Sequence, residues 1–301
     1  MNRQSGVAMI LVLMVSGMLG LLMLQVSLTA SEHLARAQQL TDRVTAELAA
    51  QSREAAMHYS LLTEPWRPQV RSENAYAAVW NFHGTPFTVD GATWRLQDES
   101  GLLPVPHDRA DRFVALVSQL GVEPARAERL GRQLMQLQSG SGLGPASVGG
   151  MRPAVPAGPA SEPTAGGRFP LQSLAEMRFL SDMDEALLAR LEPLLTLYPT
   201  PGFNPLTAPR ELLLLRLAPS QVESLLTLRE RNALNENLLW RLTGIEADDF
   251  TTVLVGPAIR MELDIQHSGV RVLRESTVIL RPYSAEPFGT WSRREQRGAE
   301  G

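Results

Sequence analysis

The first 30 residues constrain this chain more than any other segment. A short polar leader ends at Gly6, and residues 7–30 then form an apolar run. No charged residue occurs between Arg3 and Glu32. At a rise of 1.5 Å per residue, a helix over this run is about 36 Å long, which is enough to cross a hydrocarbon core of about 30 Å. The sequence therefore predicts a helix that is inserted in a membrane.

Three interpretations of this run stay open. A secretory signal peptide would have a shorter apolar core, a more basic start and a small-x-small cleavage site, whereas here Leu28 stands where a small residue belongs. A plain single-pass anchor is the second interpretation. The third is a type IV prepilin-like leader, which a peptidase cuts after a glycine and before the apolar run, and the bond between Gly6 and Val7 has that placement. Arg3 on one side is balanced by Arg36 and Arg43 on the other, so charge does not set the orientation.

The helical pattern continues beyond the apolar run. From Glu32 the sequence is polar but helix-forming, and neither Pro nor Gly occurs before Pro65. Apolar positions recur every three or four residues, at Leu34, Ala37, Leu40, Val44 and Leu48, followed by Gln51. This spacing predicts one helix over 7–62 whose second half packs on a soluble domain through that stripe. An anchor followed by an unrelated helix is the alternative.

The next segment has the pattern of strands and then of helices. Residues 86–96 contain two alternating runs around Asp90-Gly91, a pair that favours a two-residue hairpin turn. After Pro106 the apolar spacing becomes helical and breaks once at Gly121, which predicts a helical hairpin. Residues 139–167 contain eight Gly and five Pro, so this segment cannot bury enough apolar surface to offset its ordering entropy. We expect it to be a flexible loop.

Helical spacing resumes over residues 171–242, and strands return afterwards. The expected strands are 251–255, 258–266 and 270–282, with Ser268-Gly269 as a hairpin turn. Strands on both sides of a helical block predict an α+β domain into which an all-α domain is inserted. Two unconnected domains would not explain the strands that return.

Composition excludes several classes of protein. The net charge is −4, every basic residue is Arg, and no basic nucleic-acid footprint is present. The chain has no Cys, so it can form neither a disulfide nor a thiolate metal site. No metalloprotease, serine hydrolase or phosphate-binding loop motif occurs, and the five histidines are scattered. We therefore expect a structural protein and not an enzyme.

Several motifs carry a resemblance to a known family. In order along the chain, they are the leader with its apolar helix and residues 96–102, 169–178, 195–198 and 203–212. They resemble the K-type minor pseudopilin of type II secretion, the general secretion pathway protein K family. The resemblance implies a pilin-like long helix plus antiparallel sheet, with a large inserted all-α domain of the helix-hairpin-helix or SAM-like kind. It covers nearly the whole chain.

The resemblance also implies a function and a set of boundaries. It implies a subunit at the tip of the periplasmic pseudopilus, single-pass in the inner membrane, whose partners are the I-type and J-type minor pseudopilins, other pseudopilins and the prepilin peptidase. Cleavage is expected between Gly6 and Val7, with N-methylation of Val7. The predicted segments are a leader at 1–6, the helix at 7–62, sheet at 63–101, the inserted domain at 102–246, sheet at 247–284 and a disordered tail at 285–301.

Leu11 is the most informative single position. Most pilin-like subunits have Glu as the fifth mature residue, and that carboxylate can pair in lipid with the amino terminus of a neighbouring subunit. Counted from Val7, the fifth residue of this chain is Leu11. The K-type family is similar in lacking this Glu, so Leu11 is the predicted assembly residue.

The chain departs from the family in two places. Where the family commonly has an acidic segment implicated in calcium binding, residues 139–167 contain one carboxylate, Glu162. Calcium usually takes six to eight oxygens from several carboxylates, so we expect no cofactor although the family implies calcium. The step before Thr207-Ala208 is altered to Asn204-Pro-Leu, and we expect Asn204 to act in a turn or cap.

An alternative function from another class is a membrane-tethered DNA-binding protein. Residues 209–229 have the spacing of a helix-hairpin-helix module. In DNA-binding versions a Gly-rich turn brings backbone N–H groups to phosphate, whereas this turn contains Pro219, which has no N–H. We therefore expect no nucleic-acid partner.

Overall fold

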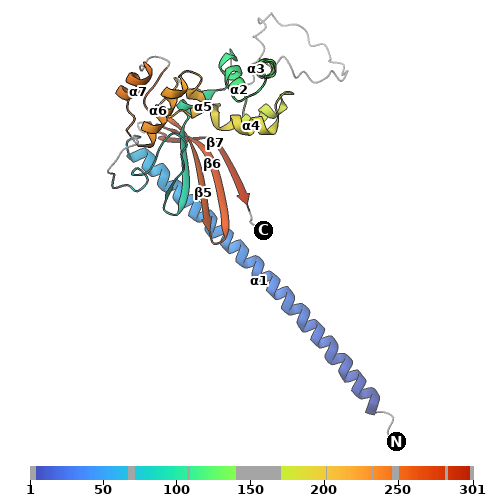
Figure 1. Ribbon diagram of the computed structural model, residues 1–301. Helices are drawn as coiled ribbons and strands as arrows, with labels where there is room; N and C mark the ends of the chain where they lie inside the picture. Colours follow the sequence, from blue (N-terminus) through green and yellow to red (C-terminus); the bar gives the residue numbers. More distant parts are fainter. Residues whose placement is uncertain are drawn as a thin grey trace, which may run out of the picture.

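The computed structural model describes residues 5–66, 72–106, 109–139, 171–200, 202–231, 233–245, 251–281 and 284–298. In Figure 1 an antiparallel sheet packs along the carboxy-terminal half of the long helix α1 (Ser5–Thr63), and the amino-terminal half of α1 projects away from the rest. Short helices gather at one end of the sheet. The predicted α+β fold, a long amino-terminal helix plus an antiparallel sheet with additional helices, is confirmed.

Helix α1 is continuous because nothing in its sequence breaks it. Its 59 residues contain no proline, and it ends two residues before Pro65. The indole Nε1 of Trp66 donates a 2.5 Å hydrogen bond to the carbonyl of Leu61, which satisfies one of the last open carbonyls of the helix. The last turn of α1 is therefore tied to the chain that follows it.

The sheet has five strands in the order β1-β2-β5-β6-β7, all antiparallel. Their bounds are β1 Phe87–Val89, β2 Ala92–Asp98, β5 Ala258–His267, β6 Val270–Leu280 and β7 Phe288–Gly298. Both predicted hairpin turns are confirmed. Asp90 and Gly91 have φ of 55° and 72°, and Ser268 and Gly269 have φ of 50° and 76°, as two-residue turns between right-twisted strands require.

In the sequence, the helical block is inserted between two strands, β2 and β5, that pair directly in the sheet. β2 and β5 are neighbours, with Asp98 opposite Ile259, although they are far apart in the sequence. Between them come the helices α2 Asp111–Gln119, α3 Pro124–Ser139, α4 Glu185–Leu191, α5 Arg210–Leu213, α6 Pro219–Glu230 and α7 Glu236–Thr243. Shorter 3-10 turns cover Glu99–Gly101, Leu174–Phe179 and Glu192–Leu194, and the two-residue strands β3 Leu103–Pro104 and β4 Leu195–Thr196 pair in parallel.

The described residues form two hydrophobic cores. One is built from the helical block and includes Phe113, Leu134, Met177 and Leu191. The other lies between α1 and the sheet and includes Trp94. Each part of the fold therefore buries its own apolar side chains, as an inserted domain does.

The structure corrects two expectations about strands. The tail 285–301 is expected to be disordered, but Phe288–Gly298 forms β7, which pairs with β6 from Arg271 to Leu280. Its charged sequence lacks the alternation of a half-buried strand, and charge is typical of a strand at a sheet edge. Residues 251–255 form no strand, because Thr251 makes only an isolated bridge to Phe203.

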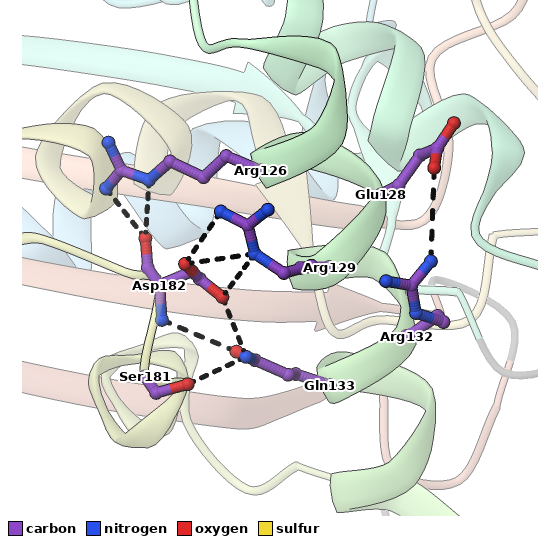
Figure 2. Close-up of polar contacts among 7 residues, drawn as sticks. All are labelled: Arg126, Glu128, Arg129, Arg132, Gln133, Ser181 and Asp182. Carbon is purple, nitrogen blue, oxygen red and sulfur yellow. Dashed lines mark hydrogen bonds and ion pairs between the residues drawn. The ribbon is translucent and has the colours of Figure 1, made fainter.

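The Gly/Pro segment at 139–167 lies outside the described residues except for Ser139, the last residue of α3. The chain that resumes at Leu171 is fastened to α3 around Asp182 (Figure 2). Arg126 donates a 2.7 Å hydrogen bond to the Asp182 carbonyl, while Arg129 and Gln133 hold its carboxylate at 3.3 and 2.9 Å. The hydrogen bond from Arg129 lowers the pKa of the Asp182 carboxyl.

Candidate assembly surface

The amino-terminal half of α1 presents apolar side chains on all sides. Among the described residues, α1 is the helix that is long and apolar enough to cross a membrane, with a mean hydropathy of 2.2 over its apolar window, none of it buried in the protein. The Leu11 side chain is 61% exposed here. Gly6 and Val7 lie in the first turns of the helix. A helix that is apolar all round and uncovered by its own protein requires lipid or another apolar surface.

The carboxy-terminal half of α1 has one face against the sheet. Ala46, Ala50, Met57 and Leu61 are buried there, together with Trp94 of β2. The four helix positions are spaced by four, seven and four residues, which places them on one side of an α-helix. Alanine has no side chain beyond Cβ, so the helix backbone comes close to the strands at this point.

The apolar stripe predicted to pack on the soluble domain is instead exposed. Leu34, Leu40, Val44 and Leu48 are 62%, 64%, 50% and 59% exposed. At about 100° per residue, this stripe lies roughly 150° around the helix from the buried face. The periodicity of the sequence predicted an apolar face correctly. It did not indicate that the sheet packs on the other face, which contains Ala46 and Ala50 and carries less apolar surface. The second half of α1 therefore has one face packed on the sheet and an apolar face that is exposed, and in this sense it is two-sided.

A buried arginine fixes which face of α1 meets the sheet. The guanidinium of Arg274, on β6, lies 2.5 Å from a carboxylate oxygen of Glu47 and 3.0 Å from one of Glu54. Arg274 is 7% exposed. Glu47 and Glu54 are seven residues apart, so both project from the same side of the helix. If α1 were rotated to bury the leucine stripe, Glu47 and Glu54 would move away from Arg274. The buried guanidinium would then lose these partners, which is costly.

The helical block is fastened to the sheet through the carboxylate of Asp98, at the end of β2. Its Oδ1 accepts from the backbone N–H groups of Ser100 and Gly256, at 3.0 and 3.1 Å. Its Oδ2 accepts from the Asn204 amide at 2.8 Å and the Thr207 hydroxyl at 2.9 Å. Asp98 and Asn204 are both 0% exposed. Burial raises the pKa of the Asp98 carboxyl, and the four donors act in the opposite direction.

The expectation that Asn204 acts in a turn is confirmed and extended. Its Oδ1 accepts the backbone N–H of Leu206 at 3.1 Å, as in an Asx turn, while its amide reaches Asp98. The chain at Gly101 can approach Thr207 closely only because residue 101 has no side chain. A Cβ there would lie 2.6 Å from the Thr207 hydroxyl and 2.8 Å from its backbone carbon. The motif residues of both segments thus meet in space, a contact that sequence reasoning did not predict.

A second buried contact lies beside the first. Glu99 is 1% exposed, and its carboxylate takes a 3.2 Å hydrogen bond from Arg260 of β5 and a 3.1 Å bond from Thr277 of β6. Arg260 also donates to the carbonyls of Glu192 and Leu195, at 3.1 and 2.8 Å. These bonds set the helical block at a fixed position on the sheet. No group of three or more His, Cys, Asp or Glu suited to a metal ion occurs within the described ranges.

These features define an α+β protein whose long helix has one half long and apolar enough to cross a membrane and the other half packed on a sheet, with a helical block fixed at the end of that sheet. Residues 94–200, about a third of the chain, match the family model of the type II secretion system (T2SS), protein K. This match confirms, over those residues, the resemblance that the motifs predict.

One comparison with solved structures gives a distant likeness. The crystal structure of the GspK-GspI-GspJ complex from the type 2 secretion system of enterotoxigenic Escherichia coli contains a chain that is 18% identical. The similarity covers 90% of this chain and 99% of that chain, with a TM-score of 0.44. A comparison with curated proteins finds no match.

Proposed function

We propose that this chain is a K-type minor pseudopilin, a protein K component of the type II secretion system. The observation that carries the proposal is the two-sided helix α1, combined with the protein K match at residues 94–200. Its apolar half anchors the subunit in the inner membrane, and its sheet and helical block lie in the periplasm. The leucine stripe, left open by the sheet, receives the helix of a neighbouring pseudopilin during assembly.

The subunit acts at the tip of the pseudopilus, in its initiation and assembly. Leu11 supplies no carboxylate to pair with the amino terminus of a subunit ahead of it. A buried charge needs such a partner, whereas a leucine does not. The helical block widens the molecule at the end of the sheet opposite the membrane half of α1, which suits an end position (Figure 1). The I-type and J-type minor pseudopilins are the partners that the resemblance of the sequence motifs to the protein K family implies.

Processing at the Gly6–Val7 bond tests the proposal. A prepilin peptidase must seat a small residue beside the scissile bond, so Gly6→Val should leave an uncut precursor in the inner membrane. Gly17→Val is the matched control, because a Cβ at Gly17 meets nothing within 4 Å. Amino-terminal sequencing and mass spectrometry of the membrane-extracted chain should give N-methylated Val7 for the wild type and for Gly17→Val. A wild-type chain that begins at Met1 or Ser31 would contradict the proposal.

Partner binding tests the proposal independently of processing. The full chain in detergent should co-purify with the I-type and J-type subunits and should not bind duplex DNA at physiological salt. DNA binding without affinity for these partners would favour a membrane-tethered DNA-binding protein. Pro219 begins α6 at the turn where such modules present backbone N–H groups, and it has no N–H to offer.

A further inference from the structure

A cavity of about 380 Å³ opens between the helical block and the segment that precedes β5. Most of its wall is apolar and includes Trp66, Phe82, Leu234 and Val253. One cationic side chain, Arg229 of α6, lines it as well. The volume lies within the range of small-ligand sites, which combine apolar walls with a few placed polar groups.

Arg229 is buried, and no acidic side chain in the described part of the chain pairs with it. It is 7% exposed, and its guanidinium donates to two backbone carbonyls, Ala208 at 2.9 Å and Pro205 at 3.1 Å. Its buried Nε has no hydrogen-bond partner among the described residues. A guanidinium has five N–H donors, so these two bonds leave donors unused. By contrast, the half-buried Arg260 pairs with Glu99, and the buried Arg274 pairs with Glu47 and Glu54.

The cavity is electropositive at neutral pH. Burial lowers the pKa of Arg229 to about 10, which leaves its guanidinium charged. Burial and the charge of Arg229 lower the pKa of His83, another lining residue, to about 4, so the imidazole is neutral. Glu236 is the carboxylate among the described lining residues, and it is exposed in the first turn of α7. Among the described lining residues, the interior therefore carries the positive charge of Arg229, and Glu236 is the acidic group at its rim.

We propose that this cavity binds a carboxylate carried on an apolar group. The unused donors of Arg229 match a carboxylate, which accepts planar, paired hydrogen bonds from a guanidinium. The apolar walls accommodate the rest of the ligand. The first turn of α7, with Asn235 as its cap, also lines the cavity, and the amino end of a helix favours negative charge. A phosphate is a poorer match, because a dianion would meet a single cation and the nearby Glu236.

Binding can be measured by calorimetry or NMR on the full-length chain in detergent, with N-acetyl-leucine as the probe. N-acetyl-leucinamide has the same apolar group without the charge, and we expect it to bind at least tenfold more weakly. Arg229→Gln should abolish binding of the acid. Because that variant could lose stability, Glu236→Gln provides a second test and should strengthen binding several-fold. Glu230→Gln removes an exposed acid of α6 outside the cavity and should leave binding unchanged.

The outcomes separate the proposal from its rivals. Equal binding of the acid and the amide, tighter binding of inorganic phosphate, or no strengthening in Glu236→Gln would overturn it. A peptide carboxy terminus and an acidic side chain supply the same chemistry. N-acetyl-leucine represents the first source and N-acetyl-glutamic acid α-amide the second, and either one binding through Arg229 supports the site. The tighter of the two identifies the source.

Discussion

The side-chain amide of Asn204 donates a 2.8 Å hydrogen bond to the carboxylate of Asp98, 106 residues earlier in the chain. Asp98 ends a strand of the sheet, and Asn204 precedes the helices α5 and α6. Both side chains are fully buried. This bond therefore joins the sheet to the helical block at a point that is closed to solvent.

Asn204→Ala should destabilise the protein by about 2–3 kcal/mol, because it removes a hydrogen bond to a buried charged group. The carboxylate of Asp98 would also lose one of its four donors. Asn81→Ala is the matched control, since the Asn81 amide makes an exposed bond to the Thr85 carbonyl. Urea unfolding of the full chain in detergent would measure both. Equal unfolding midpoints for the two variants would contradict the role of Asn204.

Arg274→Met should cost about 3–5 kcal/mol, because it leaves Glu47 and Glu54 without their buried counter-ion. Adding Glu54→Gln to this variant should recover part of the loss by removing one of the two negative charges. Arg95→Met, at an exposed pair with Glu262, should cost at most about 1 kcal/mol. If Arg95→Met and Arg274→Met were equally destabilising, the orientation of α1 would not depend on Arg274.

The two faces of α1 should respond differently to charge. Leu48→Glu lies on the exposed stripe and should change the free energy of unfolding by less than about 0.5 kcal/mol while reducing assembly with the I-type and J-type subunits. Ala50→Glu places a carboxylate on the face that is 0% exposed and should unfold the domain. Co-purification and thermal melts distinguish these effects. A large loss of stability in Leu48→Glu would show that the stripe is covered within the subunit.

His83 should make stability depend on pH. Its pKa falls from an ordinary 6.5 to about 4 in the folded protein, so the unfolded chain binds the proton more tightly between these values. Neutral His83 makes its full contribution to the free energy of unfolding above pH 6.5. This contribution declines as the pH falls toward 4, by on the order of 3 kcal/mol at most. His83→Gln should flatten this slope in urea titrations, and His267→Gln, at the exposed end of β5, should not. An unchanged slope in His83→Gln would show that His83 does not cause it.

Local pattern was sufficient for the parts of the fold that depend on neighbours in sequence. A run without proline produced α1, and Asp90-Gly91 and Ser268-Gly269 produced the hairpin turns, because these choices rest on backbone geometry. The same reasoning failed for β7, whose charged residues 288–298 form a strand only because β6 offers an open edge. Strand pairing of that kind is a long-range contact.

The sequence by itself determined that this chain has a membrane-length apolar helix, an inserted helical block and no candidate catalytic motif, since composition and spacing carry that information. Tertiary structure decided which face of α1 packs on the sheet and which stays open, because the choice depends on Arg274, more than 200 residues away. It also decided that Asp98 meets Asn204 and that Arg229 lies buried with no described acidic side chain paired to it. Burial and pairing are properties of the packed chain, and no local pattern encodes them.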